Sequence, residues 1–191
     1  EIREDVRVDA DAAAEQARID AMSPGELRAE IVRLREALIR AEWQIAEMEE
    51  RADVDSMLDV LNRRGFEREL GRALAFVKRY GTPAALMFVD LDGFKSVNDQ
   101  HGHAAGDALL RAVAGDLVRN LRASDVVGRL GGDEFGAILW NAQPPQAAAK
   151  ARSLELTVEK VALSYNGATL GCGASAGVVA LDPALTPVQM I

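Results

Sequence analysis

Residues 126–139 read Val-Val-Gly-Arg-Leu-Gly-Gly-Asp-Glu-Phe-Gly-Ala-Ile-Leu, and this stretch decides the fold of the chain. An apolar run stands on either side of a short polar turn, which contains two glycines followed by two acids. Such runs are typical of paired strands, and glycine permits the positive φ angles that a tight turn needs. The stretch therefore predicts a β-hairpin whose turn, residues 131–134, presents two carboxylates.

Outward from the hairpin, helical and strand patterns alternate along the chain. Residues 84–89 form a continuous apolar run, which suits a buried central strand. The other predicted elements are helices at 66–80, 104–121 and 145–158 and a strand at 171–180. The order helix, strand, helix, hairpin, helix, strand predicts an α+β fold, a ferredoxin-like palm with a central antiparallel sheet flanked by helices.

Upstream of this domain the apolar residues follow a heptad pattern. Ser23, Pro24 and Glu26 are typical of a capped helix start. Apolar residues then recur at alternating steps of four and three, at Leu27, Ile31, Leu34, Leu38, Ala41, Ile45, Met48 and Ala52. This seam predicts a parallel two-stranded coiled coil, in which Glu30 and Arg35 have the spacing of an interchain ion pair. The alternative is an amphipathic helix that packs on its own domain.

Composition and charge exclude several functions. The chain has 191 residues, a net charge of −8 and a single cysteine, Cys172. Nucleic-acid binding needs clustered Lys and Arg, so we expect no nucleic-acid partner. No apolar run reaches the roughly 18 residues of a membrane span, so we expect no membrane partner and a cytoplasmic location, which a lone cysteine also fits. Cys172 lies in an apolar run and is expected to be a buried, inert thiol.

Acidic and polar residues gather where the predicted strands end. Asp90 and Asp92 directly follow the buried strand, and the hairpin turn adds two further carboxylates. Two acidic turns brought together by a palm topology are typical of two-metal phosphoryl-transfer sites, although each alone is also a plain turn. A third polar segment, residues 98–107, is predicted to be a turn that leads into a helix and suits contacts with a base edge. Its two histidines stand without the further Cys or His that a zinc site requires.

Four segments carry a resemblance to a known family. Residues 129–135, Arg-Leu-Gly-Gly-Asp-Glu-Phe, match the signature of the GGDEF domain family letter for letter. The segments 90–95, 98–107 and 62–66 resemble the family's D-x-D-x-F-K, N-D with G-H-x-x-G-D, and N-R-R-x-F motifs. The chain is therefore similar to diguanylate cyclases from about residue 55 onward. The resemblance implies the nucleotidyl-cyclase form of the palm fold.

The resemblance implies an enzyme that condenses two GTP molecules into cyclic di-GMP and pyrophosphate across a homodimer. It implies catalytic roles for Asp133, Glu134 and Lys95. It implies two Mg²⁺ ions in each active site, with Mn²⁺ as an alternative, held by Asp90, the Leu91 carbonyl, Asp133 and Glu134. It implies that Asn98 and Asp107 read the guanine edge. The full set of implied substrate contacts is Phe94, Asn98, His103, Asp107, Gly131 and Gly132.

A second site is implied by Arg122-Ala-Ser-Asp125, which resembles the family's inhibitory R-x-x-D site for cyclic di-GMP. Five residues separate Asp125 from Gly131, as in the family. A further arginine is common on the next helix, where this chain has Ser153 with Arg152 adjacent, so Arg152 is included in the implied product site. The simpler alternative is an exposed helix end, where arginine favours the helix dipole.

The predicted organisation has three parts: an N-terminal arm or short helix at 1–22, a dimerising coiled-coil helix at 23–54, and the cyclase domain at 55–191. The domain departs from the family at 55–60, which has neither the Thr nor the Gly of D-x-L-T-G-L. We also expect it to be C-terminally incomplete, because the family's last helix and strand do not occur before Ile191. One alternative function is a catalytically impaired module that senses cyclic di-GMP or GTP. Another is a coiled-coil interaction protein whose globular half is passive.

Overall fold

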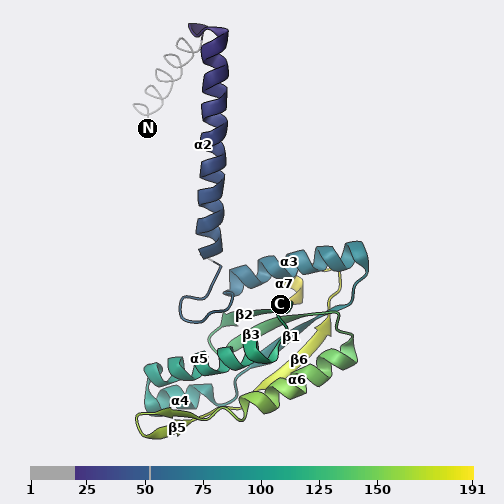
Figure 1. Cartoon of the computed structure of the whole chain (residues 1–191). Helices are drawn as coiled ribbons and strands as arrows, with labels where there is room; N and C mark the ends of the chain where they lie inside the picture. The colour runs from purple at the N-terminus through teal and green to yellow at the C-terminus, as the bar shows by residue number, and fades with distance from the viewer. Residues whose placement is uncertain (1–19, 52) are drawn as a thin grey trace, which may run out of the picture. The chain divides into compact units, whose positions relative to one another are not determined.

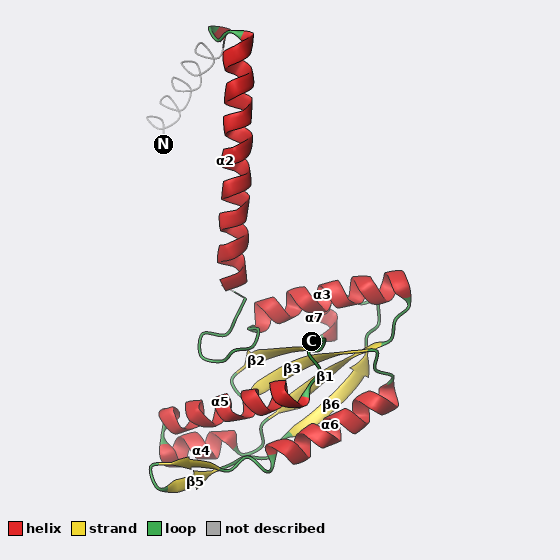
Figure 2. Ribbon diagram, in the orientation of Figure 1, coloured by secondary structure: helices red, strands yellow, loops and turns green. Residues whose placement is uncertain are grey.

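The fold is taken from a computed structural model, which describes the backbone of residues 20–51 and 53–191. The side chains are described for residues 20–43 and 53–191. The chain divides into two compact units, residues 1–49 and 50–191, and each is considered by itself. Figures 1 and 2 show their elements. Most of the predicted arm, together with Ala52 and the side chains of Ile45 and Met48, lies outside the described part of the chain.

Helix α2, Pro24–Arg51, is the long element of the first unit. Its predicted capping box is confirmed, because the Ser23 amide donates to Glu26 Oε2 over 2.8 Å and the Glu26 amide donates to Ser23 Oγ over 3.3 Å. Three seam residues, Ile31, Leu34 and Leu38, are 50–59% exposed. The coiled coil itself stays a prediction. No helix in the described part of the chain is both long and apolar enough to cross a membrane.

A four-stranded sheet forms the centre of the second unit, with the strands in the order β2-β3-β1-β6. All three neighbouring pairs are antiparallel. The strands are β1 Ala84–Asp90, β2 Val126–Gly131, β3 Glu134–Trp140 and β6 Ser175–Ala180. The predicted hairpin, the buried central strand and the antiparallel α+β architecture are confirmed.

Helices cover both faces of this sheet (Figure 2). One face packs against α3, Arg63–Tyr80, and the short helix α7, Pro187–Met190. The other face packs against α5, His103–Asn120, and α6, Pro144–Val158. Helix α4, Phe94–His101, lies beside α5. Side chains of β1 alternate between the two cores: Leu86 packs with Phe66 of α3, and Met87 packs with Leu109 of α5. This alternation is the period-2 geometry of a strand that is buried on both faces.

Two predicted segments differ in the structure. The strand expected at 171–180 begins only at Ser175, because β1 ends at Asp90 and leaves the earlier residues without a strand to pair with. The polar turn expected at 98–107 is mostly helical: α4 continues to His101, and the one break before α5 is Gly102, with φ of 84°. A small hairpin of β4, Leu163–Tyr165, and β5, Ala168–Leu170, was not predicted.

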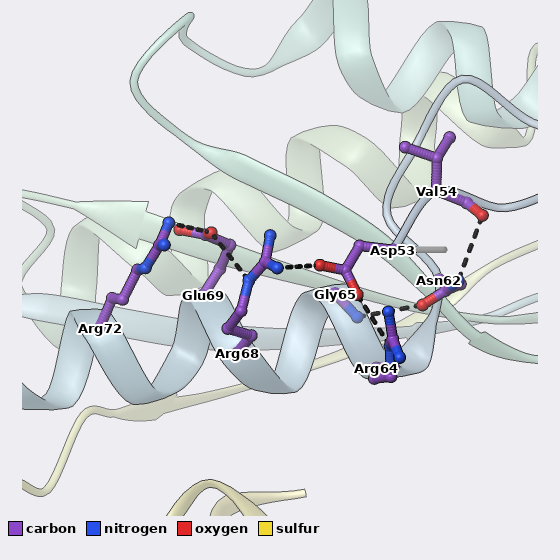
Figure 3. A network of polar contacts seen from close by, with 8 residues as sticks. All are labelled: Asp53, Val54, Asn62, Arg64, Gly65, Arg68, Glu69 and Arg72. Carbon is purple, nitrogen blue, oxygen red and sulfur yellow. Dashed lines mark hydrogen bonds and ion pairs between the residues drawn. The ribbon is translucent and has the colours of Figure 1, made fainter. Parts of the chain in front are cut away.

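The start of the domain is fastened to α3 by a buried carboxylate (Figure 3). Asp53 is 2% exposed and pairs with the guanidinium groups of Arg64, over 2.9 Å, and Arg68. Its backbone carbonyl accepts a hydrogen bond from the Asn62 amide over 2.8 Å. Gly65 lies against the same carbonyl, and a Cβ there would come within 2.3 Å of it. The absence of a side chain at Gly65 is therefore what allows the segment before α3 to lie so close to the helix.

Candidate active site

Two carboxylates from neighbouring strands lie side by side at the end of β1. Asp90 is opposite Glu134 of β3 and, on its other side, Ser175 of β6. Asp90 lies four residues after Leu86, so it faces the same side of the sheet, the side that α3 covers. Asp90, Glu134 and Ser175 line a pocket of about 430 Å³, which Arg63 of α3 also lines. The register of the sheet thus brings together two of the predicted metal ligands.

The hairpin turn is open on its outer side. Gly132 has φ of 48°, in the left-handed region that favours glycine. A Cβ added at Gly131 or Gly132 would meet no atom within 4 Å, so a ligand has room to approach the backbone. Asp133 lies in this turn and is half-buried, but it does not line the pocket of Asp90.

Arg129 joins the turn to the start of the domain. Its Nε and Nη2 donate to the Gly132 carbonyl over 2.9 and 2.8 Å, and its Nη1 lies 3.3 Å from Asp55 Oδ2. The other oxygen of Asp55 accepts hydrogen bonds from the amides of Met57 and Leu58, over 2.9 and 3.0 Å. Asp55 therefore ties the start of the domain to the hairpin turn through Arg129, although the Thr and Gly of the family motif are missing at 55–60.

The loop after β1 is braced by Asp92, an acid of the predicted acidic turn to which the family resemblance gave no role of its own. The Asp92 amide and carbonyl exchange hydrogen bonds with Gly173 over 3.0 and 3.1 Å, and its carboxylate accepts from Ser175 Oγ over 2.9 Å. Leu91, 2% exposed, anchors the loop in the core. Lys95 is exposed at the start of α4 and does not line the pocket of Asp90. In the sequence, the D-x-D pattern of residues 90–92 was the signal that could have indicated a role for Asp92.

Helices α4 and α5 touch where base contacts were predicted. A Cβ on Gly106 would lie 2.0 Å from Asn98 Oδ1 and 3.1 Å from the Phe94 ring. The Asn98 amide therefore packs directly over the backbone of α5, beside Asp107. The structure thus places Phe94 and Asn98 against Gly106, the residue before Asp107, with His103 exposed in the first turn of α5.

The predicted product site is a separate pocket of about 360 Å³, which Arg122, Asp125, Lys150 and Ser153 line. The Asp125 carboxylate accepts hydrogen bonds from the amides of Arg122, over 3.0 Å, and Trp140, over 3.1 Å. Lys150 donates to the Asn120 carbonyl at the end of α5. Arg152 does not line this pocket. It is two residues from Lys150, about 200° around the helix.

Cys172 is half-buried near the braced loop. Burial, with a smaller contribution from the negative charge of Asp92, raises the pKa of its thiol to about 11. A thiol of this kind stays protonated and is a poor nucleophile, which agrees with the expectation of an inert residue.

The acidic pocket fits a metal ion that enters with a nucleotide. In the part of the chain that the structure describes, no three His, Cys, Asp or Glu side chains gather as a cage. Mg²⁺ keeps several waters and takes one or two carboxylates together with substrate phosphates, so it does not need such a cage. Asp90 and Glu134 provide the two carboxylates in one pocket.

An antiparallel palm with paired carboxylates at the end of its central strand is the architecture of GGDEF-type nucleotidyl cyclases. Residues 52–190 match the family model "Diguanylate cyclase, GGDEF domain", and the chain belongs to this family.

Two curated relatives come from Escherichia coli K12. The chain is 42% identical to the probable diguanylate cyclase DgcE over 131 residues, 69% of this chain and 12% of DgcE. It is 37% identical to the diguanylate cyclase DosC over 125 residues, 65% of this chain and 27% of DosC. The chain thus spans no more than 27% of the length of either relative.

The fold also matches the crystal structure of the GGDEF domain of DgcB from Caulobacter crescentus in complex with cyclic di-GMP. The TM-score is 0.68 at 27% identity, over 73% of this chain and 83% of that one. This structural likeness extends the family assignment to the arrangement of the sheet and helices.

Proposed function

We propose that this chain is a diguanylate cyclase, which joins two GTP molecules into cyclic di-GMP and pyrophosphate. The observation that carries the proposal is the pocket in which Asp90 and Glu134 face the same side of the sheet, beside an open glycine turn. DgcE and DosC are named as diguanylate cyclases, which supports the same reaction here. Phosphoryl transfer needs positioning and charge neutralisation more than covalent help, and such a pocket supplies both.

In this proposal Asp90 and Glu134, with Asp133 and the Leu91 carbonyl, hold Mg²⁺, or Mn²⁺ in its place. The metal would neutralise charge on the phosphates and polarise them. Asp133 accepts the proton of the attacking 3′-hydroxyl, and Lys95 stabilises negative charge on the phosphates in the transition state.

Guanine specificity is assigned to the contact between α4 and α5. The Asn98 amide and the Asp107 carboxylate together pair with the O6 acceptor and the N1–H and N2–H₂ donors of guanine. Adenine presents a different edge, so this pair favours GTP over ATP. Phe94 and His103 border the base, and Gly131 and Gly132 leave room for the phosphates.

Dimerisation is required because one domain holds one GTP, whereas the product is made from two GTP molecules. The exposed seam of α2, with Ile31, Leu34 and Leu38, supports a parallel coiled coil between two copies. Such a tether raises the effective concentration of the second domain to about the millimolar range.

Feedback inhibition is assigned to the pocket of Arg122 and Asp125. An arginine guanidinium suits a phosphate group and stacks on guanine, and this pocket is distinct from the one that contains Asp90. The bound cyclic di-GMP of the DgcB domain supports a product complex for a relative of this chain.

The test is incubation of the purified chain, first stripped of bound nucleotide, with GTP and Mg²⁺, followed by nucleotide chromatography. We expect cyclic di-GMP from the wild type and none from Asp133→Ala, while cyclic di-GMP still binds to that variant. A wild type that binds cyclic di-GMP or GTP without forming product would support a sensor module instead. A variant that loses product binding would contradict the separation of the two pockets.

A further inference from the structure

Arg63 lines the pocket that contains Asp90 and Glu134. It belongs to the N-R-R-x-F motif, to which the resemblance gave no role. It is the first residue of α3, after the N-cap Asn62. Among the described residues that line this pocket, which include Asp90 and Glu134, it is the one basic side chain.

The guanidinium of Arg63 is fixed at two points and retains donors. Its Nε donates to Glu67 Oε1 over 3.2 Å, and its Nη1 donates to the Leu130 carbonyl over 3.2 Å. These bonds orient the plane of the group, while the side chain is 56% exposed. Arginine has five N–H donors, so most of them are left for a ligand.

The charge of the pocket points to what that ligand is. Two carboxylates alone repel a polyphosphate, and a metal ion that they bind offsets only part of its charge. An arginine at the rim provides a planar pair of donors that matches two phosphate oxygens.

We propose that Arg63 binds the phosphate chain of the nucleotide and makes this pocket select a triphosphate over a monophosphate. The inference rests on the proposed function, because it takes the substrate to be GTP at Asp90 and Glu134. It adds a residue of α3 to a site otherwise built from strand ends and turns.

The experiment compares the affinities of two probes, a non-cyclisable α,β-methylene analogue of GTP and GMP, by calorimetry with Mg²⁺. Charge-assisted bidentate bonds of this kind support an effect of about ten-fold or more. We therefore expect Arg63→Ala to weaken the analogue about ten-fold or more and GMP by less than about three-fold. Arg63→Lys should recover part of the loss.

Two control variants separate charge from structure. Glu67→Gln removes the negative charge that faces Nε but keeps an acceptor oxygen there and keeps the cation, so it should retain most of the preference for the analogue. Arg72→Ala removes an exposed charge from the same helix, where Arg72 pairs with Glu69, and should leave both affinities unchanged. If Arg63→Ala does not fold, as judged by thermal unfolding, the comparison of Arg63→Lys with Glu67→Gln carries the test.

Two failures are distinguishable. If the wild type forms cyclic di-GMP but Arg63→Ala keeps the wild-type ratio of the two affinities, Arg63 only ties α3 to β2 and the inference is wrong. If the wild type binds neither probe and forms no product, the proposed function fails, and the inference fails with it.

Discussion

Replacing Gly106 with alanine separates the stability of α5 from the placement of Asn98. Alanine in a helix is favoured over glycine by about 0.5–1 kcal/mol, so the substitution by itself stabilises α5. The new Cβ would lie 2.0 Å from Asn98 Oδ1 and 2.9 Å from its Cγ. The Asn98 amide must therefore rotate away, which offsets the helix gain and removes one of the two proposed guanine contacts.

The matched control is Gly115→Ala on the same helix, where the nearest atom to a new Cβ is Arg119 Nη1 at 3.0 Å, the end of a flexible side chain. We expect Gly115→Ala to raise the melting temperature by about 1–4 °C and leave GTP affinity unchanged. Gly106→Ala should give no such rise and should weaken GTP binding about ten-fold, the worth of one hydrogen bond to a buried partner. Equal behaviour of the two variants in both assays would refute the role given to Asn98.

Three further tests address other parts of the structure. Gly65→Ala would set a Cβ against the rigid Asp53 carbonyl and should lower the free energy of unfolding by about 1–3 kcal/mol in urea denaturation; a loss under 0.5 kcal/mol would contradict the close approach. Leu34→Lys should yield monomers by light scattering, whereas Ile39→Lys, outside the heptad seam but 52% exposed, should stay dimeric; equal masses would disprove the seam. The pKa of the Cys172 thiol is raised to about 11 from an ordinary 9.0, so its thiolate fraction at pH 8 is about a hundred-fold lower than that of an ordinary thiol. The rate of its reaction with iodoacetamide should therefore keep rising with pH up to about 11. A rate that levels off near pH 9 would contradict the burial of this thiol.

The sequence was sufficient for the parts of the fold where one local signal dominates. The runs that became β1, β2 and β3 are largely apolar and bounded by turn residues, so their existence and the pairing of β2 with β3 followed from pattern alone. Helix α4 was missed because its eight residues are mostly polar and only Phe94 among them is buried. The β4–β5 hairpin did carry a signal in the sequence, the Asn166-Gly167 pair, which is typical of a two-residue hairpin turn. Both residues have positive φ angles in the structure.

The site was less predictable, because it depends on packing between distant segments. That Asp90 lies opposite Glu134 depends on the register of the sheet, which pattern does not give. That Arg63 enters the same pocket depends on where α3 crosses the sheet. Arg152 was included because it is next to Ser153 at the aligned position of a family motif. The phase of α6 decides which of its side chains line the pocket of Arg122, and these include Lys150 and Ser153 but not Arg152.

Asp125 joins the two ends of the β2–β3 hairpin, because both of its carboxylate oxygens already accept backbone hydrogen bonds. Removing that side chain would strand the Trp140 amide and loosen the base of the hairpin whose tip carries Asp133. Under the proposed function, a variant at Asp125 would thus change turnover and product binding together, even without a contact between the product and Asp125. Arg122→Ala leaves those backbone bonds in place, so under the proposed function it is the substitution that separates feedback inhibition from turnover.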